Sequence, residues 1–494
     1  MSGADLAREM SALMLATVLV PLIVALLISW LGRWPNLREA VTLTGAGLLF
    51  LVVLRLVWIL DEAGAVTLTL WEMFPGLGMT FIAEPLGMIF ALIASGLWIV
   101  TSIYAIGYMR GHHEKNQTRF YICFAIALSS AMGIAFAGNM LTLFIFYELL
   151  TLSTYPLVTH AGNNEAKAGG RTYLGILLFT SIAFLLTAVI WTWAVAGTLD
   201  FTAGGILDGK ASPGVATALL VLYVFGVGKA ALMPFHRWLP AAMVAPAPVS
   251  ALLHAVAVVK AGVFTVLKVA VYIFGIDFLA GVASSRWLMY VAAATVLIAS
   301  LVAMRQDNLK RRLAYSTVSQ LSYIVLAAML ATPLAIVGGA MHIAMHAFGK
   351  ITLFFCAGAI DVALHKKNIS DMGGIGRAMP ITMGAFLIAS LSIIGLPPLG
   401  GLWSKWYIAL GALQADEVAM VAVLMISSLL NVAYLLPIPI RAFFGKPADG
   451  AEITGLKEAP LPSVIAICVT AAGSVALFFF PEPLYRLAQA ILGN

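Results

Sequence analysis

The amino-acid sequence predicts an all-α integral membrane protein with about fourteen transmembrane helices, and three observations support this prediction. First, 62% of the residues are hydrophobic and only 10% are charged, whereas about a quarter of the residues of a soluble domain are charged. Second, the apolar residues are gathered in runs of the roughly 20 residues that one span requires. Third, the basic residues between these runs are distributed unevenly between the two sides of the predicted bundle.

The predicted spans follow the apolar runs in chain order. The first run begins near Met10 and ends near Leu31, and it has neither a basic preceding region nor an obvious cleavage site, so no cleavable signal peptide is expected. Two of the spans contain internal prolines and are expected to be broken. The spans lie near residues 10–31, 40–60, 82–109, 118–138, 140–161, 170–197, 214–245 (broken), 247–276, 284–304, 312–330, 333–360, 380–413 (broken), 418–444 and 461–480.

Lysine and arginine are concentrated in the loops of one side. Eighteen basic residues fall on that side, while the other side has only Arg8, Lys210, Arg286 and Arg486. Cytoplasmic loops are enriched in lysine and arginine, so both termini are expected on the outer side of a bacterial inner membrane. This bias also accounts for the net charge of +6 and the pI near 9.1. Nucleic acid is therefore not expected as a partner.

The sequence contains no pattern typical of a cofactor site. Cys123, Cys356 and Cys468 are scattered in apolar runs without CxxC spacing, so neither an iron–sulfur cluster nor a disulfide framework is indicated. A dinucleotide-binding glycine fingerprint and a haem-type histidine pair are also missing from the sequence. No cofactor and no metal centre are expected in this chain.

Residues 222–264 are the most unusual part of the chain. Lys229 and Lys260 stand in apolar helical surroundings, and the segment between them contains four prolines, Pro234 and Pro240 among them. Each proline removes a backbone donor and clashes with the preceding turn, so an uninterrupted helix is excluded. In a membrane, the freed carbonyl groups are tolerated only inside protein or along a wet cavity.

A second break is expected at residues 395–401, which read GLPPLGG and contain Pro397 and Pro398. Lys405 follows this break, whereas Lys229 is expected to precede its own. Two interrupted helices five spans apart predict two five-helix repeats of opposite membrane orientation, because an odd offset inverts the topology. The predicted organisation is an N-terminal three-helix segment (1–117), a first repeat of spans four to eight (118–276), a second repeat of spans nine to thirteen (284–446) and a C-terminal helix (447–494).

Charged residues within the spans are the strongest functional signal. One acid, Glu148, is clearly intramembrane, against six basic residues. Each charge at a helix centre costs about 2.5–3.5 kcal/mol on insertion scales. Glu148 can form a static ion pair with one lysine, but it cannot neutralise four of them. Arg55 and Lys268 lie toward span ends and are interpreted as side chains that reach the interface. The remaining lysines are Lys229, Lys260, Lys350 and Lys405, and we expect them to take up and release protons, since desolvation and neighbouring cations disfavour the charged form.

Histidines extend this row of titratable groups. His342, His346 and Lys350 recur at a spacing of four residues, so they share one face of an otherwise apolar helix. A stripe of three titratable groups favours a proton wire over simple packing. Metal ligation by the two histidines is disfavoured by the cationic Lys350 on the same face. His254 stands near Lys260 and belongs to the same set of candidates.

Five long motifs carry a family resemblance. They are FIFYELLTLSTYPLV around Glu148, GKAALMPFHRWLPAAMVAPAPVSALLHAVAVVKAGVF, the run RRLAYSTVSQLSY from Arg311, MHIAMHAFGKITLFF, and GLPPLGGLWSKW. Over residues 80–445, the chain resembles the antiporter-like membrane subunits shared by Mrp-type multisubunit cation/proton antiporters and respiratory complex I. The resemblance implies fourteen helices with two inverted repeats. It also implies that proton transfer is carried by Glu148, Lys229, Lys260, His254, His342, His346, Lys350 and Lys405.

The resemblance leaves two functions open. A D-type Mrp subunit fits the motifs, which implies a proton-translocating subunit of a Na⁺/proton antiporter. The alternative is a proton-pumping subunit of a complex I-like NADH or ferredoxin:quinone oxidoreductase, in which this chain holds no redox site and is at most a translocase subunit. M-type subunits usually carry glutamate where Lys405 stands, N-type subunits lack the glutamate at Glu148, and the eighth span is similar to A and L types. The partners expected are other membrane subunits, the lipid bilayer, protons and, as a candidate ion, Na⁺.

Overall fold

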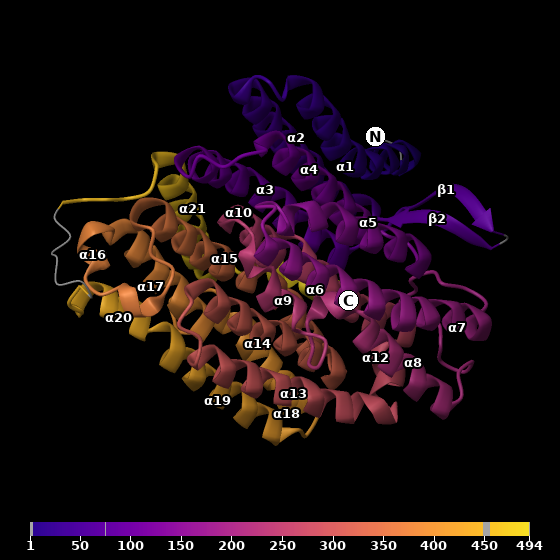
Figure 1. Ribbon diagram of the computed structural model, residues 1–494. Helices are drawn as coiled ribbons and strands as arrows, with labels where there is room; N and C mark the ends of the chain where they lie inside the picture. Colours follow the sequence, from indigo (N-terminus) through magenta and orange to yellow (C-terminus); the bar gives the residue numbers. More distant parts are fainter. Residues whose placement is uncertain (1–2, 75, 448–454, 494) are drawn as a thin grey trace.

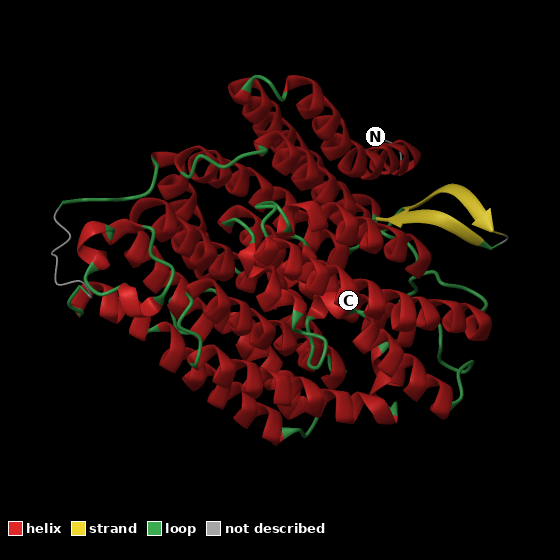
Figure 2. Cartoon of the chain, in the orientation of Figure 1, coloured by secondary structure: helices red, strands yellow, loops and turns green. Residues whose placement is uncertain are grey.

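The computed structural model describes residues 3–74, 76–447 and 455–493, and it shows a bundle of long helices with one small hairpin (Figures 1 and 2). In the described residues, 12 helices are long and apolar enough to cross a membrane, and two further apolar helices, Pro213–Gly226 and Pro380–Ile394, are shorter. The predicted all-α membrane class is confirmed. Parts of the predicted segments 1–117 and 447–494 lie outside the described residues.

The N-terminal part consists of three helices and the hairpin. Prolines occupy the first turns of α2 and α3, where their missing N–H has no helical partner to lose. The hairpin projects from one end of the bundle, opposite the end where α16 and α20 lie (Figure 1). It was not expected from the sequence. The elements are α1 (Gly3–Leu31), α2 (Pro35–Ala63), β1 (Thr67–Phe74), β2 (Leu77–Ile82) and α3 (Pro85–Gly111), with β1 antiparallel to β2.

The next helices begin at asparagine caps. Asn139 and Asn163 each accept a hydrogen bond from a backbone N–H in the first turn that follows, which satisfies donors that the helix itself leaves unpaired. The predicted span near 170–197 starts earlier, at Asn164, and contains a π-helical turn. The elements are α4 (Gln117–Ala135), α5 (Met140–Val158), α6 (Asn164–Thr180), η1 (Ser181–Leu186) and α7 (Thr187–Ala196).

The first broken helix is interrupted earlier than the sequence predicts. Helix α8 ends at Gly226, so Lys229 lies inside the break and not before it, which corrects the expectation. The backbone leaves the helical conformation at Val227 (φ −78°, ψ 63°), and the indole of Trp238 satisfies the carbonyl group of Gly228 that is freed there. The elements are α8 (Pro213–Gly226), η2 (Gly228–Ala230), α9 (Trp238–Ala241), η3 (Ala242–Val244), α10 (Ala247–Ala251), η4 (Leu252–Val256), α11 (Val258–Lys268), η5 (Val269–Phe274) and α12 (Ile276–Ala280).

Helix α15 (Pro333–Leu364) lies at the centre of the remaining bundle, in contact with α3, α14, α17, α18 and α21. The second break separates α17 from α18 at Pro397 and Pro398, as predicted. The other elements are α13 (Ala283–Met304), α14 (Leu309–Leu330), η6 (Ile369–Asp371), α16 (Ile375–Ala378), α17 (Pro380–Ile394), α18 (Gly401–Gln414), α19 (Val418–Leu435), α20 (Pro437–Phe444), α21 (Leu461–Phe479) and α22 (Glu482–Ala490).

Candidate functional site

Lys229 is fully buried in the first break and is held by residues of α5. Its ammonium donates to the carbonyl oxygen of Tyr147 at 2.8 Å and to the hydroxyl of Thr151 at 2.5 Å. It also lies 3.1 Å from the centroid of the Tyr147 ring, where the negative face of the ring attracts a cation. Both hydrogen-bond acceptors are neutral groups.

Glu148 stands next to Tyr147 on α5 but does not touch the lysine. Among the described residues, Glu148 has no ion pair within 4.0 Å, and its buried Oε1 has no hydrogen-bond partner. Opposite charges still attract each other through space when they are not in contact. The static ion pair between Glu148 and a lysine, which the sequence analysis kept as an alternative, is therefore absent from the described residues. Glu148 and Lys229 can interact only through space.

The backbone around Lys229 is fixed by two further contacts. The indole N–H of Trp238 donates to the carbonyl oxygen of Gly228 at 2.9 Å, which satisfies a group that the break frees. Helix α11 packs directly against this turn, because Gly262 has no side chain, and a Cβ there would come within 3.0 Å of the Lys229 backbone. The break thus brings the backbones of the segments that carry Lys229 and Lys260 into contact.

Lys260 and His346 meet in the middle of the bundle. The ammonium of Lys260 on α11 lies 2.5 Å from Nδ1 of His346 on α15, and both side chains are buried. His254 is fully buried nearby, and its ring packs on Phe354 with centroids 4.4 Å apart. Neither ring nitrogen of His254 has a hydrogen-bond partner among the described residues. Buried polar atoms in native proteins are nearly always paired, by water where protein does not reach them.

The row continues from α15 to α18. The ring of His346 stacks on the ring of His342, with centroids 5.7 Å apart. Nδ1 of His342 lies 2.8 Å from the hydroxyl of Ser404, which precedes Lys405. Tyr323 of α14 stacks on His342 at 5.6 Å, and the same ring lies 5.0 Å from the Lys405 ammonium. These contacts connect Lys260 with the neighbourhood of Lys405 through two imidazoles.

Lys405 closes the end of α17. Its ammonium donates to the carbonyl oxygens of Ile393 at 2.8 Å and Ile394 at 3.0 Å, and to the hydroxyl of Ser428 at 3.3 Å. The last carbonyls of a helix have no helical donor and carry partial negative charge, so a cation is stabilised there. Lys405 follows its break, as predicted.

Lys350 points to a separate branch. Its ammonium donates to the hydroxyl of Ser316 on α14 at 2.5 Å, and that hydroxyl lies 2.7 Å from the hydroxyl of Tyr434 on α19. Tyr434 in turn donates to the side-chain oxygen of Asn431. His342, His346 and Lys350 all belong to α15, but the hydrogen bonds of Lys350 lead away from Ser404. The predicted stripe therefore shares one helix, but its members contact different partners. The two histidines contact Lys260 and Ser404, whereas Lys350 contacts Ser316.

Of the two basic residues assigned to the interface, Lys268 differs from that expectation and Arg55 does not. Lys268 is fully buried, pairs with Glu84 at 2.8 Å and donates to the Ala137 carbonyl at 2.6 Å, so the interpretation as an interfacial side chain was wrong. Arg55 is about 30% exposed and forms a salt bridge with Glu9 at 2.7 Å. Sequence reasoning missed Glu84 because it precedes Pro85 at a span end, where an acid is ordinarily solvated.

Four neutral polar residues were also missed as members of the site. Tyr147, Thr151 and Ser316 accept hydrogen bonds from the buried lysines. Gln320 is fully buried on α14 between Ser316 and Tyr323, and neither polar atom of its side chain has a partner among the described residues. Their signal in the sequence is polar residues on the faces of apolar helices, which is weaker than a charge because hydroxyls often bond to their own helix.

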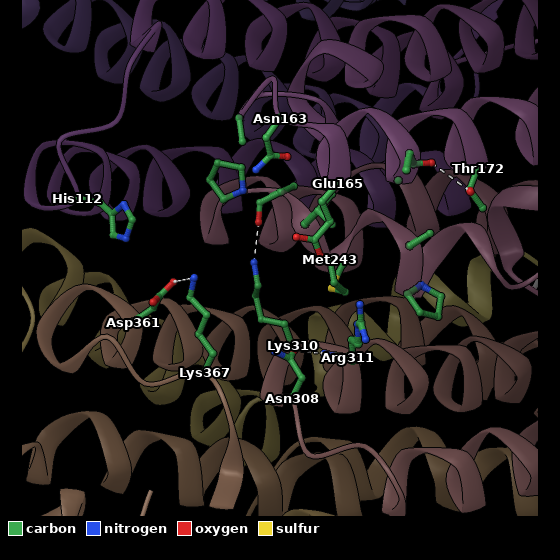
Figure 3. A pocket seen from close by; sticks show the side chains of 18 of the residues that line it. His112, Asn163, Glu165, Thr172, Met243, Asn308, Lys310, Arg311, Asp361 and Lys367 are labelled. Atoms are coloured by element: carbon green, nitrogen blue, oxygen red, sulfur yellow. Dashed lines mark hydrogen bonds and ion pairs between the residues drawn. The ribbon is translucent and has the colours of Figure 1, made fainter. Parts of the chain in front are cut away.

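A cavity of about 690 Å³ opens near the basic loops (Figure 3). Its walls come from the ends of α3, α6, α14 and α15 and from the proline-rich segment between α9 and α10. Lys310 reaches across it and donates to the carbonyl oxygen of Ala245 at 2.6 Å. Ala245 lies in the loop that leads into α10 and η4, where His254 is located. The cavity therefore connects the basic side with the segment between the two buried lysines.

The arrangement defines an integral membrane protein with a row of buried titratable groups across its bundle. The chain belongs to the family described as "NADH:quinone oxidoreductase/Mrp antiporter, TM", which matches residues 137–431. It is 34% identical over 426 residues to the N-type subunit of the NADH-quinone oxidoreductase of Desulforudis audaxviator, a match that covers 83% of this chain and 84% of that protein. It is 26% identical to the D-type subunit of the Na(+)/H(+) antiporter of Alkalihalophilus pseudofirmus over 98% of this chain and 97% of that protein.

The fold is shared with a solved assembly. A chain of the Mrp complex from Dietzia sp. DQ12-45-1b superposes with a TM-score of 0.86 at 23% identity, over 98% of this chain and 97% of that chain. Against several longer relatives, this chain spans only 40 to 57% of the relative's length. The family resemblance expected from the sequence is confirmed.

Proposed function

We propose that this chain translocates protons as a membrane subunit of a multisubunit Na⁺/proton antiporter of Mrp type. The match to the D-type antiporter relative covers nearly the whole chain, and the fold of an Mrp complex chain agrees over 98% of it. The partners are then other membrane subunits of the same complex, and the ions are protons and Na⁺.

The observation that most supports proton transfer is the contact from Lys260 through His346 and His342 to Ser404. Imidazole can accept a proton at one nitrogen and release one from the other. The two rings share no hydrogen bond, and Nε2 of each has no partner among the described residues, so in this proposal water joins these nitrogens and completes the relay. Buried ionisable residues in membrane spans mark ion pathways more often than static structure. In this proposal Lys229 and Lys405 are carriers at the two breaks, and Lys260 with His254 connects the first of them to α15.

Glu148 acts on this path from a distance. In this proposal a nearby negative charge favours a cation at Lys229 through space, while Tyr147 and Thr151 remain the direct acceptors of the ammonium. A displacement of either side chain would change the proton affinity of Lys229. This is a means by which an event elsewhere in the complex can be coupled to proton uptake.

The orientation and the repeats belong to the same proposal. The loops rich in lysine and arginine face the cytoplasm of a bacterial inner membrane, and both termini face outward. The cavity beside Lys310 then serves as the cytoplasmic access route to the region of His254. Two inverted five-helix units, 118–276 and 284–446, each contribute one broken helix, and fourteen spans result when the broken ones are counted whole.

A second candidate function is supported by sequence identity. The oxidoreductase relative at 34% is more similar than the D-type antiporter relative at 26%. In that case the same path operates as part of a complex I-like NADH or ferredoxin:quinone oxidoreductase, and the redox chemistry occurs in partner subunits.

Purification through a tag on this chain distinguishes the two functions. An antiporter predicts co-purifying membrane proteins only, together with Na⁺-dependent proton flux when the complex is reconstituted in vesicles with an internal pH dye. An oxidoreductase predicts co-purifying iron–sulfur and flavin subunits and a proton flux that requires reduced donor and quinone. A chain that purifies in neither kind of assembly, and moves no protons in either assay, would contradict the proposal.

A further inference from the structure

Three metal-binding side chains converge at the basic end of the bundle, away from the buried row. His112 is the cap residue at the end of α3, Asp361 lies in the last turn of α15, and His365 is the cap residue at the end of α15. One potential ligand atom of each residue lies within 4.8 Å of those of the other two. This is the one group of at least three such side chains found among the residues that the structure describes. It joins two helices that are more than 200 residues apart in the chain.

The chemistry of the three groups fits a transition-metal ion. Two imidazoles and one carboxylate are a ligand set that Zn²⁺ binds at about 2.0–2.2 Å, with a fourth position left for water. Ca²⁺ and Mg²⁺ instead prefer ligand sets made of oxygen atoms. Glu114 lies 3.3 Å from Nδ1 of His112, and such a carboxylate fixes the ring of a metal-binding histidine and leaves Nε2 for the ion.

The competing interaction at Asp361 is weak. Lys367 is the nearest cation, with its ammonium 3.8 Å from the carboxylate and its side chain 64% exposed. A surface pair of this kind contributes about 0–1 kcal/mol. The lysine is free to move into solvent when a dication binds. His365 is exposed and His112 is half-buried, so the site can be reached from the basic side.

The three residues lie where a bound ion would affect access to the cavity. His112 and Asp361 line both the 690 Å³ cavity and a neighbouring cavity of 530 Å³. Figure 3 shows His112 and Asp361 on facing walls of the larger cavity, with Lys310 farther along it. An ion held by these residues would stand at the mouth of the route that leads to Lys310.

The same ion would tie α3 to α15. His112 stacks on Tyr108 at 5.5 Å and Tyr108 on Tyr104 at 6.0 Å, and Tyr104 stacks on Phe355 of α15 at 3.9 Å. Tyr104 also donates to the Phe355 carbonyl at 2.9 Å. Phe354, the preceding residue of α15, packs on His254. A metal ion at the helix ends would thus restrain the segment that faces His254.

We propose that His112, Asp361 and His365 form a binding site for Zn²⁺ or a similar transition-metal ion, which links α3 to α15 and slows proton passage from the basic side. The binding part of this inference stands on the three side chains alone. The slowing of proton passage rests on the proposed function.

Binding is tested on the purified complex that contains the full chain. Equilibrium dialysis against Zn²⁺ should find one ion per chain in the wild type. In His112→Ala and His365→Asn the affinity for this ion should fall at least about 10–100-fold, the range observed for residues that only support a metal ligand. Asparagine is chosen at His365 because that residue has a φ of 54°. His113→Asn is the matched control, because it removes the adjacent exposed histidine and asparagine tolerates its positive φ of 52°. No bound ion in the wild type, or equal affinity in all variants, would overturn the site.

Transport then tests the consequence separately. Zn²⁺ added to the basic side of reconstituted vesicles should inhibit wild-type proton flux and the His113→Asn variant, but not His112→Ala or Asp361→Asn at equal assembly. Zinc that binds at the three residues without inhibition would reject the gating role and leave the binding site standing. A complex that transports no protons with or without zinc, yet binds one ion per chain, would instead count against the proposed function.

Discussion

At Lys229, a buried ammonium is held by a carbonyl, a hydroxyl and an aromatic face, while the neighbouring acid Glu148 stays out of contact. A contact ion pair in low dielectric would hold the proton too firmly for exchange, since removal of one partner of a buried pair costs several kcal/mol. Neutral acceptors satisfy the hydrogen bonds of the Lys229 ammonium, and they leave no unpaired charge behind when the lysine loses its proton and becomes an amine. Glu148 adds a bias that depends on its distance from the lysine.

We therefore expect Glu148→Gln to reduce proton transport at least about tenfold while the complex still assembles, because a loss of about 1.4 kcal/mol of electrostatic bias already changes a protonation equilibrium tenfold. The amide keeps the size of the side chain. Vesicle transport with the assembled complex is the measurement. Glu62→Gln, an exposed acid at the end of α2, is the control and should transport as wild type does. Normal flux in an assembled Glu148→Gln complex would refute this role.

Lys229 itself can be tested with two substitutions. Lys229→Ala removes the carrier, and Lys229→Arg keeps the charge but cannot release a proton, so both should abolish transport. Only the arginine variant separates a carrier from a fixed charge. Gel filtration of the purified complex must show normal assembly for each variant. Proton flux near the wild-type level with arginine would mean that Lys229 acts as a permanent cation.

At the scale of elements, spacing and composition predicted what lies within one helix. The four-residue spacing of His342, His346 and Lys350 gave one face of α15, and the prolines gave two breaks. The hairpin was missed because its pairing is irregular after Thr69 and Glu72, which disturbs the alternation of residues along the strands. The partners of the lysines were missed because they come from distant segments: His346 for Lys260 and Glu84 for Lys268. Such pairs depend on tertiary packing, which periodicity does not encode.

The contact between η2 and α11 depends on one glycine. Gly262→Ala should lower the free energy of unfolding by about 1–3 kcal/mol. It should also reduce transport, because the added Cβ forces α11 away from the Lys229 backbone. Gly175→Ala on α6 is the matched control, since its Cβ meets nothing within 4 Å. Thermal unfolding in detergent, followed by vesicle transport, measures both effects. Equal stability of the two variants would mean that the contact is not tight in solution.

Lys405 combines a structural and a proposed transport role at the second break. Lys405→Arg should still satisfy the carbonyls of Ile393 and Ile394 and assemble normally, but it should stop transport, because a guanidinium keeps its proton. Lys405→Met should in addition reduce assembly, because two buried carbonyls lose their donor at about 1–3 kcal/mol each. Expression level and flux separate the two roles. Transport by the arginine variant would leave Lys405 as a helix cap alone.

Across the whole molecule, the two broken helices are joined through α15. The first break packs against α11, whose Lys260 contacts His346 of α15, and α18 after the second break contacts His342 of α15 through Ser404. Lys350 lies outside this series of contacts. Its hydrogen bonds run through Ser316 and Tyr434 to Asn431 and form a side branch that extends to α19. A proton that crosses between the halves along these contacts must pass His346, whereas it does not need to visit Lys350 if the direct route through His342 suffices.

A substitution at His346 should therefore interrupt proton transfer between the two halves of the molecule. His346→Gln should cut proton flux by at least about 100-fold, the lower range for loss of a proton-transferring group, while the buried amide can still accept a hydrogen bond from Lys260. Lys350→Ala should also interrupt transfer if the branch is obligatory, so the ratio of the two fluxes reports which route carries the protons. The control is Lys210→Ala, which removes an exposed lysine outside the buried row and should leave the flux unchanged. Full flux in assembled His346→Gln would show that protons cross the membrane within one half of the molecule.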